Sequence, residues 1–437
     1  MTKYRTAYVN ARLLDPESRL DAAGGMLVED GRIVDLGPGL FAKGAPAGAE
    51  IVDCGGHCLA PGLVDARVQL REPGHEHMEN IQTAGHAAAA GGVASMVCLP
   101  NTEPPVDDVP VMEFIARRAR EVKLAKVYCY AALTRGLAGA ELTEIGLLTE
   151  AGAVGFTDAE TPIANAKTMQ RALSYGSTFG ALIVQHPEEP ALAEGGHMNT
   201  GEISSRLGLS GMSALAEVMM VERDLLLVAA TRGRYHAAHL STRAAVDAIR
   251  RAKSRGLDVT CDTAPHYFAL NEMAIGDYRT FAKVRPPLRS EDDRQAIVEG
   301  LRDGTIDMIA SDHSPHDQDS KRLPFVQATF GIIGLETLLP LTLELVHNGH
   351  LSLLDALALV TSRPAARLGL KAGRLAKGGA ADLVLFDPDK PWRIDEAAFR
   401  SKSKNSPFGG RPVQGRVLRT VVDGRTIFNA DTAREDS

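Results

Sequence analysis

The sequence predicts an α/β protein: a (β/α)8 barrel of the TIM type with a small β-sandwich domain built from both chain ends. Two observations lead to this prediction. Between residues 61 and 369, short apolar runs alternate with longer stretches of helical periodicity, the pattern of repeated βα units. In residues 1–60 and 370–437, short strand patterns are instead separated by turn residues. A chain of 437 residues has room for one large and one small domain.

The two ends of the chain share one kind of pattern. In the first 60 residues, "EDGRIVDLG" contains Asp30-Gly31, the residue pair typical of a two-residue hairpin turn. After residue 370, "GRLAKGGAADLVLFDP" and "RVLRTVVDGRTIFN" are again strand patterns, with a second Asp-Gly turn. The simplest arrangement is one composite β domain, 1–60 plus 370–437, beside a barrel formed by 61–369.

The central region supplies the strands and helices that a barrel needs. Helical stretches follow the apolar runs, for example "PVMEFIARRAREV" and "TRAAVDAIRRAKSRG", with apolar residues spaced three and four apart. The eight predicted strands are "GLVDARV", "ASMVCLP", "AKVYCYAAL", "AVGFTD", "ALIVQH", "RYHAAHLS", "DVTCDTAPH" and "DMIASDH".

Composition excludes several classes of protein. The net charge of −7 comes from well-mixed acidic and basic residues, so neither nucleic acid nor an anionic membrane is expected as a partner. The N-terminus has no apolar signal segment, and no run of 18 apolar residues occurs. The five cysteines form no CxxC pair, and we expect free thiols in a reducing cytoplasm.

Polar residues end several predicted strands, and in such barrels the carboxyl ends of the strands carry function. Asp158, His186, His239 and Asp312 each lie at or near such an end. Nitrogen and oxygen ligands of this kind suit zinc, and three of them with one open position make a catalytic site. A single histidine at a strand end is more often a satisfied structural residue, so the prediction depends on the four occurring together.

Many short segments of the chain resemble the dihydroorotases (class I type) of the amidohydrolase superfamily. The resemblance covers nearly the whole chain and implies the same two-domain fold. The family reaction is the reversible cyclisation of N-carbamoyl-L-aspartate to dihydroorotate in pyrimidine biosynthesis, with zinc polarising the amide carbonyl. The segments that carry the resemblance are "APGLVD", "LREPGHEH", "LPNTEPPVDD", "GAVGFTD", "HLST", "APHYFAL", "RPPLR", "GTIDMIASDHSPH", "FGIIGLET" and "GRLAKGGAADLVLFDP".

The resemblance also implies roles for individual residues. Asp312 would be the catalytic base and a metal ligand, Asp158 a bridging carboxylate, and His186 and His239 the imidazoles of one metal site. Arg71, Asn101 and His316 would bind the substrate carboxylate, for which a guanidinium offers a charge-assisted fork. Taken alone, Arg71 could equally be part of an ordinary ion pair.

The chain departs from the family at the end of its first barrel strand. The family has His-x-His there, whereas this chain has Arg67-Val68-Gln69. Arginine stays protonated in proteins and cannot bind a metal ion. We therefore expect Arg67 to pair with Asp158 and Asp312, and zinc to occupy at most one residual site or none.

Other substitutions and histidines bear on the same question. Arg285 stands where relatives usually have Asn, and a larger cation there would take up substrate space. His75 and His77 have His-x-His spacing but follow Pro73-Gly74, so we do not expect them to replace the missing pair. His197 is expected on a surface loop and His266 in a structural role.

Three functions remain open from the sequence. The first is a catalytically degenerate family member that acts as a structural partner of aspartate carbamoyltransferase. The second is an active zinc dihydroorotase that uses a residual single-metal site. The third is a sensor that binds dihydroorotate or N-carbamoyl-L-aspartate without turning it over. A homodimer is expected in each case.

Overall fold

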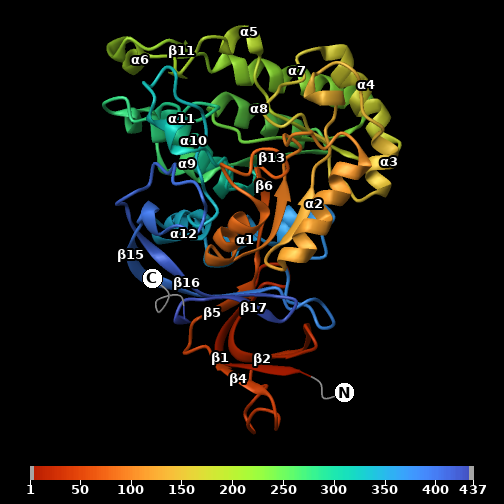
Figure 1. Ribbon diagram of the computed structural model, residues 1–437, viewed down its shortest axis with the longest axis vertical. Helices are drawn as coiled ribbons and strands as arrows, with labels where there is room; N and C mark the ends of the chain where they lie inside the picture. The colour runs from red at the N-terminus through yellow and green to blue at the C-terminus, as the bar shows by residue number, and fades with distance from the viewer. Residues whose placement is uncertain (1–3, 433–437) are drawn as a thin grey trace.

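The computed structural model describes residues 4–432 of the chain; residues 1–3 and 433–437, which the predicted β domain included, lie outside this range. Strands from both chain ends form one mixed sheet of eight strands, here called the terminal sheet, which lies below the rest of the molecule in Figure 1. Its strands are β1 (Arg5–Asp15), β2 (Leu20–Glu29), β3 (Arg32–Gly37), β4 (Glu50–Asp53), β5 (Cys58–Pro61), β15 (Leu383–Arg393), β16 (Pro412–Val422) and β17 (Arg425–Asn429).

The two halves of the terminal sheet meet where β5 pairs antiparallel with β15, with Leu59 opposite Leu385. Its apolar residues form a core that joins both chain ends, since Leu13 and Met26 cluster with Leu383 and Val421. This sheet agrees with the predicted involvement of both ends, although its strands are hydrogen-bonded in one continuous order rather than in two separate sheets.

Seven parallel strands form two further sheets, in the orders β6-β7-β8 and β14-β13-β12-β9. Isolated parallel bridges connect them: Phe156 pairs with both Ala131 and Ile183, and Val68 pairs with His313. The segments therefore follow one another from β6 to β14 and back to β6, the order expected of a (β/α)8 barrel. The strands are β6 (Leu63–Val68), β7 (Val93–Cys98), β8 (Lys126–Cys129), β9 (Leu182–Gln185), β12 (Arg234–Ala237), β13 (Val259–Thr263) and β14 (Met308–Ile309).

These strands are buried along their length, as parallel strands covered on both faces must be; every residue of β6 and β7 is buried. An apolar cluster that includes Val97, Leu182 and Ala310 joins strands from across the region. The predicted strand "AVGFTD" is the exception to regular pairing, because only its Phe156 forms bridges. All five cysteines are free and buried.

Helices cover the parallel strands on the outside (Figure 1), and their ends carry the expected caps. Asn80 forms a capping box with Thr83, and Thr242 and Ser290 cap two later helices. The helices are α1 (Ile81–Ala90), α2 (Val109–Val122), α3 (Ile145–Glu150), α4 (Ala166–Ser177), α5 (Pro190–Ala193), α6 (Glu202–Leu207), α7 (Leu215–Thr231), α8 (Arg243–Ser254), α9 (Pro265–Ala269), α10 (Glu291–Arg302), α11 (Gln318–Arg322), α12 (Leu338–His347), α13 (Leu353–Ala358) and α14 (Ser362–Arg367), with a short strand pair β10 (Met198–Asn199) and β11 (Gly211–Met212) between α5 and α7.

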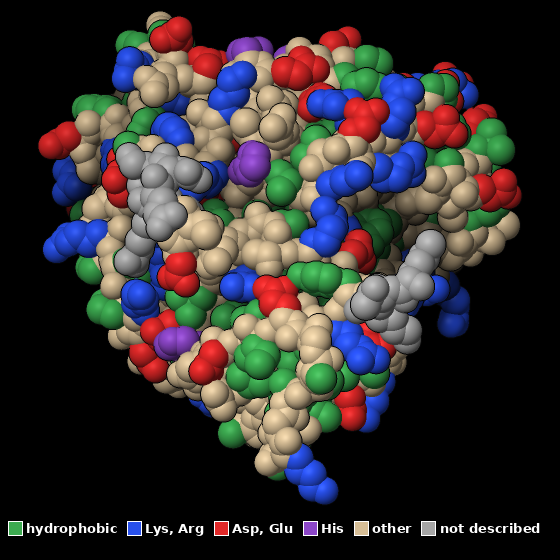
Figure 2. Space-filling model, turned by 60° about the horizontal axis from the view of Figure 1, so that its bottom comes forward, with side chains coloured by type: hydrophobic (Ala, Val, Ile, Leu, Met, Phe, Trp, Pro, Cys, Tyr) green, Lys and Arg blue, Asp and Glu red, His purple; other side chains and the backbone are tan. Residues whose placement is uncertain are grey.

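Two expectations from composition concern the distribution of charge on the surface and the absence of a membrane-spanning helix. Acidic and basic side chains are intermixed over the face shown in Figure 2. Within residues 4–432, no helix combines the length and apolar character that a membrane crossing requires.

Candidate functional site

The polar residues at the carboxyl ends of the parallel strands lie on one side of the molecule, as the order of these strands requires. Three of these residues and one neighbour have a left-handed backbone: φ is 60° at Arg71, 39° at His239, 53° at Asp312 and 58° at Ala159. Residues other than glycine adopt this conformation rarely, and such positions cluster at functional sites. The strand ends therefore turn sharply where their side chains enter the mouth of the barrel.

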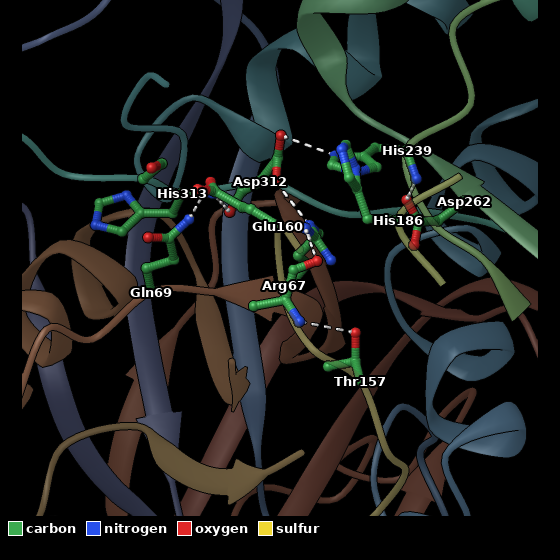
Figure 3. A network of polar contacts seen from close by, with 12 residues as sticks. Arg67, Gln69, Thr157, Glu160, His186, His239, Asp262, Asp312 and His313 are labelled. Carbon is green, nitrogen blue, oxygen red and sulfur yellow. Dashed lines mark hydrogen bonds and ion pairs between the residues drawn. The ribbon is translucent and has the colours of Figure 1, made fainter. Parts of the chain in front are cut away.

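Arg67 occupies the centre of the mouth (Figure 3). Its side chain is 2% exposed, and Nε donates to Oδ1 of Asp312 at 2.8 Å. Burial opposes ionisation of the Asp312 carboxyl, but His239 and Arg67 outweigh it and hold its pKa well below the usual range. The predicted pairing of Arg67 with Asp312 is present.

The two predicted imidazole ligands contact each other. Nδ1 of His186 lies 2.7 Å from Nε2 of His239, whose Nδ1 is 3.3 Å from Oδ2 of Asp312. In a hydrogen bond between two ring nitrogens, one must donate and the other accept. The backbone N–H of His239 donates to Oδ1 of Asp262 at 2.7 Å, which fixes its position at the strand end.

Asp158 does not join this cluster, contrary to the prediction. Its Oδ1 accepts from the backbone N–H of Thr134 at 2.8 Å, and its Oδ2 accepts from the hydroxyl of the same residue. Burial raises the pKa of the Asp158 carboxyl, although the bonds from Thr134 act against this rise. Asp158 therefore anchors the loop after β8, and Arg67 has Asp312 as its only ion-pair partner among the described residues.

Glu160, which sequence reasoning missed, supplies the second carboxylate of the mouth. Its Oε1 accepts from Nε2 of Gln69 at 2.7 Å, and Oε1 of Gln69 accepts from Asn101 at 3.2 Å. Partial loss of solvent opposes ionisation of Glu160, but the guanidinium groups of Arg71 and Arg67 lower its pKa. The sequence did contain one signal for Glu160, because it lies only two residues after Asp158 in "FTDAE".

Arg71 and His316 lie together, as predicted, whereas Asn101 contacts Gln69 instead. Nη2 of Arg71 is 3.4 Å from Nε2 of His316 and donates to Oγ of Ser314 at 3.3 Å. Burial lowers the pKa of Arg71, and burial together with Arg71 lowers that of His316 to about 4. Since Arg71 can only donate, Nε2 of the neutral His316 ring accepts, which leaves Nδ1 as the N–H donor.

Arg285 forms an ion pair that the sequence did not predict. Its Nε donates to Oε1 of Glu188 at 2.8 Å, and Oε2 of Glu188 lies 3.7 Å from Nε2 of His186. Burial acts against ionisation of Glu188, but His186 and Arg285 lower its pKa to about 2. Arg285 thus extends the charged network outward from the imidazole pair.

The remaining histidines do not complete a metal site. The rings of His75 and His77 are 6.2 Å apart and perpendicular, outside the cluster. His266 is fully buried with its ring 4.1 Å from that of Tyr267, and its Nε2 lies 4.0 Å from Oδ2 of Asp312. Neither ring nitrogen has a hydrogen-bond partner among residues 4–432, and the structural role expected for it stays a prediction. His197 is half-buried rather than at the surface, and Nδ1 of its ring is buried without a hydrogen-bond partner among the described residues.

These residues do not fit a catalytic zinc ion in the arrangement described. Among residues 4–432, no three His, Cys, Asp or Glu side chains converge as ligands would. Asp158 is turned to Thr134, the two imidazoles bond to each other, and Arg67 holds an oxygen of Asp312. A three-ligand zinc site requires these donors to face one point.

Comparison with known proteins assigns the family. A model of the dihydro-orotase-like family matches residues 56–245, and a model of the amidohydrolase family matches residues 211–428. Proteins named dihydroorotase from Anaplasma phagocytophilum and from the Wolbachia of Brugia malayi are each 48% identical, covering 98% of this chain and 96% of their own length. A third, from Syntrophotalea carbinolica, is 46% identical over 96% of this chain and 98% of its own.

Solved structures agree on the fold. L-hydantoinase from Arthrobacter aurescens superposes with a TM-score of 0.87 at 26% identity, covering 98% of this chain and 96% of its own. Dihydropyrimidinase from Brevibacillus agri gives a TM-score of 0.81 at 22% identity over 97% and 95%. These matches span the barrel and the terminal sheet alike. The chain belongs to the dihydroorotase-like family of the amidohydrolases.

Proposed function

We propose that this protein acts at the dihydroorotase step of pyrimidine biosynthesis and binds N-carbamoyl-L-aspartate or dihydroorotate in the barrel mouth. Arg71 carries the proposal. It has no carboxylate within ion-pair distance among residues 4–432, and its partners there are neutral: oxygens of Pro315 and Ser314 and Nε2 of His316. A guanidinium withdrawn from solvent gains most from an anionic partner, and the carboxylate of either ligand would supply one.

The neutral ring of His316 supports the same ligand class. Its Nδ1 is buried and has no hydrogen-bond partner in the part of the chain described, so the N–H at that atom is available to an acceptor. An imidazole N–H and a guanidinium are both donors that suit a carboxylate acceptor.

Two activities at this step are candidates, and the relatives favour the first, reversible hydrolysis of the cyclic amide. Proteins named dihydroorotase match almost the whole chain at 46–48% identity. In that activity Asp312 would accept and return the proton of water, while Arg71 and His316 hold the substrate carboxylate.

The second candidate is a non-catalytic structural partner of aspartate carbamoyltransferase, and the Arg67–Asp312 ion pair favours it. Burial opposes ionisation of Asp312, but His239 and Arg67 hold its pKa well below the usual range, whereas a general base works best with a pKa near the working pH. Arg67 also supplies positive charge at a position where the family has metal ligands. We propose a homodimer in either case.

One experiment separates the two candidates: zinc content and dihydroorotase activity of the wild type, Asp312→Ala and the double variant Arg67→His/Gln69→His. Stoichiometric zinc and activity in the wild type, both lost in Asp312→Ala, would establish the hydrolase. Absence of both from the wild type, with zinc uptake and activity in the double variant, would establish loss of the metal ligands as the cause of inactivity. Co-purification with aspartate carbamoyltransferase then tests the structural role, which fails if the two proteins never associate.

A further inference from the structure

A long connection of the terminal sheet reaches across to the barrel mouth. Residues 394–411, here called the strap, join β15 to β16 and contain one short 3-10 helix, η4 (Glu396–Ala398). Its two ends are closed by backbone bonds between Ile394 and Arg411 and between Gly410 and Ile394. The strap therefore leaves and rejoins the sheet at one place, and its middle is free to dock elsewhere.

Two carboxylates of the barrel region hold the first half of the strap. Oε1 of Glu336 accepts from the backbone N–H of Arg400 at 2.6 Å and of Ser401 at 3.2 Å. Oε1 of Glu79 accepts from the backbone N–H of Lys402 at 3.2 Å, and the hydroxyl of Ser401 donates to its other oxygen. Bonds from two carboxyl groups to three consecutive backbone amides fix the path of the chain before it reaches the mouth.

This path of the chain places Asn405 at the mouth. It is 2% exposed, and its Nδ2 donates to the backbone oxygens of Ser314 at 2.9 Å and Gly331 at 3.1 Å. Its Oδ1 accepts from the backbone N–H of His316 at 3.2 Å, and its own carbonyl accepts from Ile333. One amide side chain thus joins the two backbone segments that border the Arg71–His316 pair.

The segment on the far side of Asn405 packs directly against the His316 ring. Gly331 has a φ of +113°, and a Cβ at that position would lie 3.1 Å from Nε2 of His316 and 2.6 Å from Oγ of Ser314. These are the same two atoms that Nη2 of Arg71 contacts. A small movement of either backbone segment would therefore displace both partners of the guanidinium.

We propose that Asn405 is a positioning residue, which sets His316 and Ser314 against Arg71 so that the three form one binding site for a ligand carboxylate. The inference rests on the proposed carboxylate binding at Arg71. Within residues 4–432 the side-chain hydrogen bonds of Asn405 all go to backbone atoms, so it acts through His316. The terminal sheet thereby contributes, through the strap, to recognition of the ligand in the barrel.

Calorimetric titration of the full chain with dihydroorotate and with dihydrouracil, which lacks the carboxylate, tests this role. Loss of the bonds made by one side-chain amide in Asn405→Ala should weaken dihydroorotate binding about tenfold and leave dihydrouracil binding unchanged. Ser403→Ala is the matched control, because Ser403 fastens the strap to the carbonyl of Met78 at 2.8 Å but does not reach residues 314–333. Equal affinities of wild type and Asn405→Ala for dihydroorotate would overturn the inference.

Hydrogen exchange separates this failure from failure of the proposed function. Without any ligand, Asn405→Ala should speed exchange at the backbone amide of His316, while Ser403→Ala should not. Wild-type protein that binds no dihydroorotate would overturn carboxylate binding and the ligand role of Asn405 together. Unchanged exchange at His316 in Asn405→Ala would overturn the positioning role by itself, whatever the ligand result.

Discussion

Arg67 and Asp312 form an ion pair, and burying either charge without the other would cost free energy. The Arg67 side chain is 2% exposed and that of Asp312 is 14% exposed. Removing one partner of such a pair leaves an uncompensated charge, whereas removing both leaves only a change in packing. The pair is therefore a constraint between two strand ends, β6 and the segment after β14.

A double-mutant cycle measures this constraint. We expect Arg67→Met and Asp312→Leu each to lower the free energy of unfolding by ~3–5 kcal/mol, as removal of one partner of a buried pair does. The combined variant should cost clearly less than the sum of the two, which denaturation in urea will show. The exposed pair Arg12–Asp21 provides the control, since its side chains are 44% and 37% exposed, and Arg12→Met should cost ~1 kcal/mol or less. Strictly additive effects at Arg67 and Asp312 would contradict the expected coupling.

The sequence predicts only those parts of the site that are formed by residues directly after the parallel strands. The contacts of Arg67 with Asp312 and of Arg71 with His316 are of this kind, because strand ends in parallel order converge. Asp158 was predicted to lie in the mouth and Glu160 was missed, and the backbone of Ala159 between them is left-handed with a φ of 58°. One such turn changes which side chain enters the mouth. No residue pattern predicts a left-handed backbone at an alanine.

At the level of elements, helices α2 and α8 could be predicted closely because apolar spacing and the N-cap residues Asp108 and Thr242 both mark them. The strap could not, since it is held by backbone bonds to Glu79 and Glu336 from distant parts of the chain. Contacts of this type leave no periodicity in the sequence. The residues from the strap that matter for the site, above all Asn405, were missed for that reason.

Glu336 should make the stability of the strap region depend on pH. Burial raises its pKa from 4.5 to about 7, although the backbone N–H groups of Ser401 and Arg400 act against the rise. The folded protein then holds a proton that the unfolded chain releases between these values. Raising the pH through this window lowers the free energy of unfolding, at most ~1.4 kcal/mol per pH unit.

Urea denaturation of wild type and Glu336→Gln between pH 5 and 8 checks this sign. The difference in the free energy of unfolding between wild type and variant should fall as the pH rises towards about 7 and then level off. Glu194→Gln, at an exposed position, should give no such trend. A difference that rises with pH would mean that Glu336 is ionised more easily in the folded protein than in the unfolded chain.

At the scale of the whole molecule, the terminal sheet and the barrel region share an apolar core. Val384 and Val417 of the sheet belong to the same buried cluster as Val93 and Ile81 of the barrel region. Only Gly62 separates β5 from β6, and a Cβ there would lie 2.4 Å from the Cβ of Ala94. The chain therefore passes from one part to the other without a linker, unlike the flexible junctions between independent domains.

We accordingly expect one cooperative unfolding transition for both parts, and Lys126 offers a test. Its Nζ on β8 lies 2.8 Å from Asp382 and 2.8 Å from Asp423 of the terminal sheet, and the Asp382 side chain is only 7% exposed. Lys126→Met leaves Asp382 without its cation, so the free energy of unfolding should fall by ~2–3 kcal/mol. Circular dichroism and the fluorescence of Trp392, which lies in β15 of the sheet, should still report the same midpoint. Separate midpoints in the wild type would show that the shared core does not couple the two parts, and a variant as stable as wild type would remove the role of this ion pair.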